Sequence, residues 1–75
     1  MQSGVYIYPN PTKENVTIRI NNFNGNIQTE VYDLIGHRLQ STNETTISLQ
    51  DYASGIYLLK VAYGDKLQEV KVIKQ

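Results

Sequence analysis

Apolar residues alternate with polar ones along much of this chain, and that alternation is the feature that most constrains its fold. In the run Val16-Thr-Ile-Arg-Ile20, the valine and both isoleucines fall on one side of an extended backbone. Thr17 and Arg19 fall on the other side, as in a strand that buries one face. A helix would need apolar residues at a period near 3.6, and no convincing run of that kind is present. The chain is therefore predicted to be built from strands.

Turn signals separate the predicted strands. Asn24-Gly25 is typical of a hairpin because both residues tolerate positive φ, and Gly64-Asp65 indicates a two-residue loop of the same class. Asp33-Leu-Ile-Gly36 has the Asp-first, Gly-last pattern of a four-residue turn. The strands are expected at residues 5–8, 16–20, 27–32, 37–40, 45–49, 55–63 and 66–74. About seven short strands predict an all-β fold, a small antiparallel β-sandwich of Greek-key or immunoglobulin-like kind.

The residues expected in the core share even spacing within their strands, which turns them to one face. A chain of 75 residues buries a modest fraction of its surface, so each of them should matter for folding. The predicted inward residues are Val16, Ile18, Ile20, Ile27, Val31, Leu39, Ile47, Leu49, Tyr57, Leu59, Val61, Val70 and Val72.

Two prolines flank one asparagine in the segment Tyr8-Pro-Asn-Pro11. Proline has no N–H donor and a fixed φ, so the first strand must end there. We expect a rigid corner without ladder pairing that passes the chain from one sheet edge to the next. Residues 1–4 read as a linker or an expression remnant, and the folded domain is predicted to span residues 5–75.

Composition gives little sign of chemistry. Seven acidic residues balance seven Lys and Arg, so nucleic acid is not an expected partner. Cysteine is absent, which removes disulfides and thiolate metal sites, and no metal or cofactor is expected. His37 is interpreted as an exposed turn residue, and Asp33 and Asp51 as turn-forming residues. No catalytic residue is predicted, and the domain is not expected to be an enzyme.

Two stretches depart from one-sided alternation. In Ile56-Tyr-Leu-Leu-Lys60 both faces of the strand begin apolar, so Ile56 and Leu58 should point outward. Near the end, Ile73 should face outward between Lys71 and Lys74 if the neighbouring valines face inward. Residues 60–75 carry four lysines against two acidic residues. These features predict an exposed contact patch at a basic end of the chain.

Four stretches occur in a recognisable order: YPNPTKENVTI, VYDLIGHRL, ISLQDYASGIYLLKV and KVIKQ. Together they resemble the type A C-terminal sorting domain of the Bacteroidota type IX secretion system. The resemblance implies a non-catalytic β-sandwich that directs an upstream cargo domain of the same chain through the outer-membrane translocon. The cargo would then be secreted or reach the cell surface. Its implied partners are the translocon and the associated shuttle and sortase components, with cleavage of the domain and release or anchoring of the cargo.

The resemblance also assigns motif residues by position. Tyr8, Pro9, Asn10 and Pro11 correspond to the motif at the start of the module. Deletion of residues 71–75 is expected to block export and to cost the fold only a fraying strand end. The expected recognition residues are Gly55, Ile56, Tyr57, Leu58, Gly64, Lys71, Ile73, Lys74 and Gln75.

An alternative from another class is a carbohydrate-binding or adhesive β-sandwich. Tyrosines would then form an exposed platform for sugar rings. Tyr6 and Tyr8 share a strand face and could be joined by Tyr32, Tyr52 and Tyr63. A passive fibronectin-like spacer is a third possibility.

Overall fold

The computed structural model describes residues 4–75 and contains seven strands. Those predicted at residues 5–8, 27–32, 55–63 and 66–74 have the expected bounds, and the others differ by one or two residues at an end. Within the described residues no helix is long and apolar enough to cross a membrane. The strands are β1 (Val5–Tyr8), β2 (Asn15–Ile20), β3 (Ile27–Tyr32), β4 (Arg38–Thr42), β5 (Thr46–Ser48), β6 (Gly55–Tyr63) and β7 (Lys66–Lys74).

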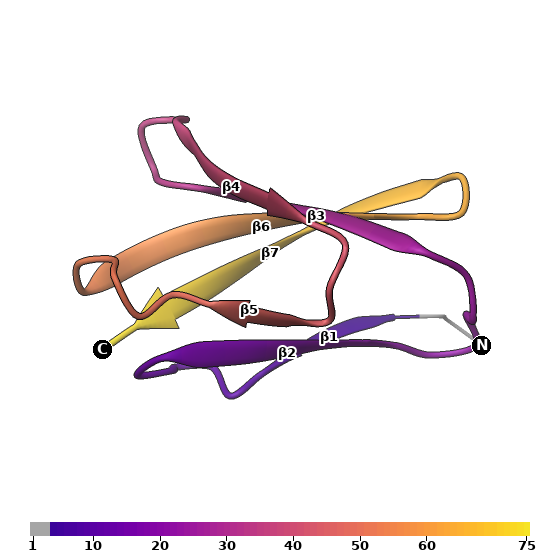
Figure 1. Ribbon diagram of the computed structural model, residues 1–75, viewed down its shortest axis with the longest axis horizontal. Coiled ribbons are helices and arrows are strands. Elements are labelled where there is room, and N and C mark those ends of the chain that lie inside the picture. The colour runs from indigo at the N-terminus through magenta and orange to yellow at the C-terminus, as the bar shows by residue number, and fades with distance from the viewer. Residues whose placement is uncertain (1–3) are drawn as a thin grey trace.

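The strands form two antiparallel sheets that face each other. One sheet has the order β1-β2-β5 and the other the order β4-β3-β6-β7. Figure 1 shows the four-stranded sheet as the upper layer and the three-stranded sheet as the lower one. Placing β2 beside β5 and β3 beside β6 follows the neighbour pattern of immunoglobulin-like sandwiches. The predicted fold class is confirmed.

The core is a single apolar layer between the sheets. Every residue predicted to face inward, except Leu39, is buried or packs against this layer. Sequence reasoning left out Val5, Ile7 and Tyr63, which are also buried. The first two lie on β1, which was too short to show a clear alternation.

Leu39 is exposed, so its predicted inward placement is wrong. Val31 pairs with Gln40 but Tyr32 pairs with Arg38, which leaves Leu39 as an extra residue in β4. Such a bulge shifts the alternation by one position. Gln40 takes the inner side instead, where its Nε2 donates hydrogen bonds to Ser48 O (3.0 Å) and Tyr52 Oη (2.8 Å).

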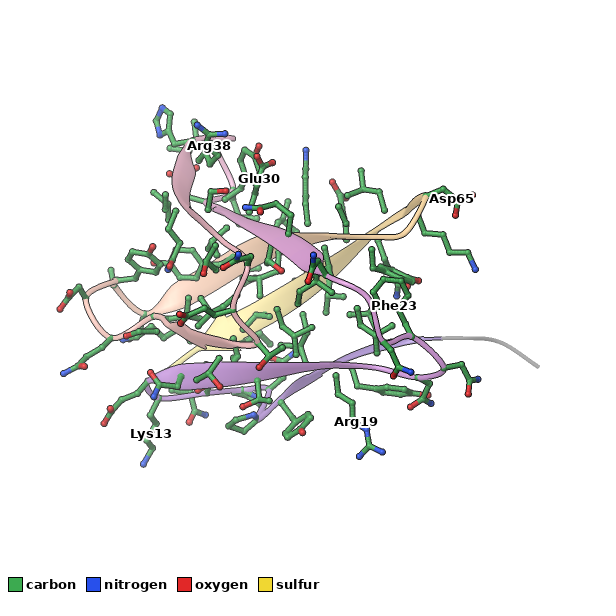
Figure 2. All side chains as sticks on the ribbon, turned by 45° about the vertical axis from the view of Figure 1, so that its right-hand side comes forward. Lys13, Arg19, Phe23, Glu30, Arg38 and Asp65 are labelled. Carbon is green, nitrogen blue, oxygen red and sulfur yellow. The ribbon has the colours of Figure 1, made fainter. Side chains whose placement is uncertain are left out.

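Asn24-Gly25 does not form the predicted hairpin, because β2 and β3 belong to different sheets. Phe23 packs in this connection with its ring edge-on to Tyr63, at a centroid distance of 5.4 Å. Figure 2 shows Phe23 where the chain crosses between the layers. A Cβ on Gly25 would lie 2.8 Å from the Phe23 ring, so the glycine permits this close approach. The loop at Gly64 is as predicted: its φ is 60°, and Tyr63 pairs with Lys66 across the turn.

The proline segment also differs from its prediction. It joins β1 to β2 within one sheet, where Val5 pairs with Ile20 and Tyr8 with Thr17, and does not pass to another sheet. Both X–Pro peptide bonds are cis. Residues 9–11 form no backbone ladder, as predicted, and Thr12 directly after them forms a parallel bridge with Lys74. We call residues 8–12 the proline corner.

Of the predicted linker, residues 1–3 lie outside the described part of the chain. Gly4 is described, and its carbonyl oxygen accepts a hydrogen bond from Asn21 N (3.1 Å). This hydrogen bond continues the antiparallel pairing of β1 with β2 by one residue beyond the Val5–Ile20 pair. Gly4 is therefore tied to the end of β2, and the predicted domain boundary stays a prediction.

Leu59→Ala should lower the free energy of unfolding by about 2–5 kcal/mol, because it leaves a cavity in the core layer. Leu59 is completely buried on β6. Chemical denaturation followed by circular dichroism measures the change. Leu67→Ala is the matched control, since Leu67 is exposed on the outer face of β7. Equal stabilities of the two variants would contradict the assigned inner face.

Candidate recognition surface

Strands β6 and β7 place two of the predicted recognition motifs side by side. Ile56 pairs with Ile73 and Leu58 pairs with Lys71 across the hairpin. Paired residues in adjacent strands point to the same face of a sheet. The exposed fractions of Ile56 and Ile73 are 36% and 43%, which confirms that both point outward. Residues 17 positions apart in sequence thus form one apolar contact on the surface.

This contact continues across the four-stranded sheet onto β3. Leu58 also pairs with Tyr32, and Lys60 Nζ lies 4.6 Å from the centroid of the Tyr32 ring. Lys60 is 3.7 Å from a Glu69 carboxylate oxygen on β7, so charged side chains border the apolar residues. We call Tyr32, Ile56, Leu58, Lys71 and Ile73 the outer stripe.

The turn between β3 and β4 is fixed by one carboxylate. Asp33 Oδ1 accepts hydrogen bonds from the backbone N–H groups of Ile35 (3.0 Å), Gly36 (2.9 Å) and His37 (2.9 Å). The His37 backbone N–H is the main cause that holds the pKa of Asp33 below its usual value. The predicted turn-forming role of Asp33 is confirmed, and His37 is exposed as predicted.

This rigid turn presents two large apolar side chains to solvent. The exposed fraction of Leu34 is 61% and that of Ile35 is 81%. Both line a shallow groove that reaches the outer stripe; its lining residues are Tyr32, Asp33, Leu34, Ile35, Gly36, Leu58, Lys60 and Glu69. Sequence reasoning missed Leu34 and Ile35 as surface features. The available signal was a pair of large apolar residues inside a turn, where polar residues are usual.

Polar contacts fix the edge of the same face. Arg38 Nη1 lies 3.1 Å from Glu30 Oε2, and Tyr32 Oη donates a hydrogen bond to Glu30 Oε1 (2.8 Å). Figure 2 shows Glu30 and Arg38 together above β3 and β4. The Tyr32 hydroxyl is the main cause of a lowered pKa of Glu30, and the same hydrogen bond raises the pKa of Tyr32. Tyr32 is thereby held at the end of the outer stripe.

Not every predicted recognition residue belongs to this surface. Tyr57 is buried, and its hydroxyl donates to Ala53 O (2.6 Å) while its ring packs beside Tyr52. Gly64 lies in the turn at the other end of the β6–β7 hairpin. Gly55 pairs with Lys74 at the near end. The structure therefore gathers Gly55, Ile56, Leu58 and the terminal residues, and separates Tyr57 and Gly64 from them.

The terminal motif meets the proline corner. Thr12 N donates to Ile73 O (2.9 Å), and Gln75 N donates to Thr12 O (2.8 Å). In Figure 1 the end of β7 reaches the lower layer beside the connection from β1 to β2. Val72, between these contacts, is completely buried. Deletion of residues 71–75 would therefore remove a core residue, and the expectation that it costs only a fraying end is wrong.

The tyrosines do not form a common platform. Tyr6 and Tyr8 are exposed on β1 of the three-stranded sheet, whereas Tyr32 lies on the outer face of the four-stranded sheet. Tyr63 is buried and Tyr52 packs on Tyr57. Among residues 4–75, no group of three or more His, Asp or Glu side chains is placed to hold a metal ion.

Residues 6–75 match the family model described as the secretion system C-terminal sorting domain. This chain belongs to that family. It is also 31% identical over 77 residues to the protein named ulvan lyase NLR42 from Nonlabens ulvanivorans. That alignment covers 95% of this chain but 14% of the relative, so the chain spans a small part of the relative's length.

The sorting domain is a secretion signal of the type IX system, as its sequence motifs indicated. Proteins that carry such a domain are exported through the outer membrane to the cell surface or the medium. The family itself is non-catalytic.

The Asp33 carboxyl should titrate below the value of about 3.9 found for unstructured Asp. Because the pKa of Asp33 is lower in the folded state, its ionised carboxylate stabilises the turn at pH values above the unfolded-state pKa. This stabilisation is lost as the pH falls through the folded-state pKa. Carboxyl NMR titration measures the pKa, and amide exchange at Ile35 and His37 reports loss of the turn. His37→Ala separates the causes: it keeps the backbone N–H but removes the ring nitrogen that lies 3.2 Å from Asp33 Oδ2, so the Asp33 pKa should rise in part and stay below its ordinary value. Titration of Asp33 at or above the ordinary value would contradict this account.

Proposed function

We propose that the secretion machinery reads this sorting domain through the outer stripe together with the turn residues Leu34 and Ile35. The observation that carries the proposal is the convergence of separate motifs on one exposed face. Residues from β3, β6, β7 and the β3–β4 turn meet there, on the side of the sheet opposite the core.

The composition of this face suits reversible recognition. Interfaces combine an apolar centre with a polar, solvated rim. Here Ile56, Leu58 and Ile73 supply the centre, and Lys60 and Lys71 lie beside them. The Asp33 turn is held by three backbone hydrogen bonds, so Leu34 and Ile35 are presented in a fixed geometry. Little conformational entropy would therefore be lost when a partner binds these two side chains.

The finer steps follow from the family and are part of the same proposal. The recognising partners are the translocon and its shuttle and sortase components. The cargo is a larger domain in the same polypeptide. The related lyase suggests this, because the alignment with this chain covers only 14% of its length. After transport the sorting domain is cleaved, and the cargo is released or anchored at the surface.

The test is export of a reporter fused ahead of this domain in a type IX-competent bacterium. An Ile56→Ser/Ile73→Ser double variant should lower export roughly tenfold, which corresponds to about 1.4 kcal/mol of lost binding. Leu67→Ser is the matched control, because Leu67 is exposed on β7 but lies outside the outer stripe. Circular dichroism checks that both variants fold.

Two results would contradict the proposal. If the unmodified fusion stays in the periplasm, the sorting domain does not act as a complete signal. If the double variant is exported as well as the Leu67 control, the outer stripe is not the surface that is read.

A further inference from the structure

Strand β7 is an edge strand of the four-stranded sheet, and β6 is its neighbour within that sheet. Backbone groups along an antiparallel strand point alternately toward and away from the neighbouring strand. The N–H of Ile73 and the carbonyl of Lys71 point away from β6, since both bind the proline corner. An unprotected edge of this kind offers its backbone to other strands.

The side chain of Asn10 binds this edge as a strand would. Its Oδ1 accepts a hydrogen bond from Ile73 N (2.9 Å), and its Nδ2 donates one to Lys71 O (2.9 Å). One acceptor and one donor thus flank Val72, which is how a residue in a parallel strand contacts its neighbour. Thr12 repeats the pattern with its backbone around Lys74.

The flanking prolines explain why a side chain does this work. Pro9 and Pro11 fix φ on both sides of Asn10, so the backbone there does not continue from Thr12 as a regular strand. A carboxamide carries both an acceptor and a donor, which replaces the missing backbone pair.

The base of this contact is fixed independently of β7. The Thr12 hydroxyl is buried; it donates to Asn15 O (2.6 Å) and accepts from Glu14 N (3.3 Å). Glu14 O in turn accepts from Leu49 N (2.8 Å), next to the end of β5. The proline corner is therefore anchored to the three-stranded sheet while it holds the edge of the other sheet.

We propose that the proline corner is a clasp that closes the outer edge of β7 and holds residues 71–75 in an extended, ordered conformation. The clasp makes the terminal motif depend on the motif at the start of the domain. The consequence of the clasp for sorting rests on the proposed function. The secretion machinery would encounter residues 71–75 in an ordered conformation only when β1 and the proline corner are folded. Release of the clasp would free backbone groups of Lys71, Ile73 and Gln75 for another strand.

Amide hydrogen exchange on the isolated chain tests the clasp without any export assay. In Asn10→Ala, the Ile73 amide should exchange about tenfold faster, as expected for loss of one net hydrogen bond. The Val72 amide faces β6 and should keep its rate. Asn10→Asp keeps the acceptor for Ile73 N–H, so this amide should exchange more slowly than in Asn10→Ala. Asn24→Ala, in the connection from β2 to β3, is the control.

An unchanged Ile73 rate in Asn10→Ala would overturn the clasp. Equal acceleration of Ile73 and Val72 would also overturn it, because Asn10 would then stabilise the whole fold and not the edge.

The same variants in the reporter fusion test the link to sorting. Export should fall for Asn10→Ala and stay unchanged for Asn24→Ala, although residues 71–75 are intact in both. Faster Ile73 exchange with undiminished export would overturn the dependence of sorting on the clasp. If the unmodified fusion is not exported, that result would instead count against the proposed function.

Discussion

Burial of one apolar layer between two sheets is the constraint on which the rest of this structure depends. The chain has no cysteine, so no disulfide assists it, and 75 residues leave room for a single layer. Val16, Val31, Leu49, Leu59 and Val72 are completely buried in that layer and come from both sheets. Because alternate residues are committed to the core, those between them are fixed on the outside. The surface chemistry of the domain follows from the register of its core.

Because the register of the core fixes which side chains lie outside, a domain of a non-catalytic family can still present a defined recognition surface. The outer face of the four-stranded sheet keeps Ile56, Leu58 and Ile73 at positions where polar residues would be sufficient for folding. The Asp33 turn adds Leu34 and Ile35 at one end of this face. Exposed apolar residues that do not serve the core are a common mark of interaction surfaces. In the proposed function, the signal is distributed over strands that only the fold brings together.

Alternation and turn chemistry predicted the strands and most of the core, and particular residues show where this reasoning stops. Leu39 was misplaced because a bulge in β4 shifts the period by one residue, and no local pattern marks that shift. Asn24-Gly25 carries the composition of a hairpin, but β2 and β3 belong to different sheets, and Gly25 instead leaves space for Phe23 to pack on Tyr63. Tyr57 was assigned both to the core and to recognition; its burial confirms the first assignment, and the second stays a prediction.

The sequence by itself determined the all-β class, the turns at Asp33–Gly36 and Gly64–Asp65, the outward direction of Ile56 and Ile73, and the family through its ordered motifs. These properties depend on the alternation of neighbouring residues and on backbone preferences, which are local. Only the tertiary structure decided that the proline corner returns to its own sheet and that Asn10 pairs with Lys71 and Ile73. Contacts across 61 and 63 residues depend on how the two sheets are stacked, and local sequence preferences do not specify that arrangement.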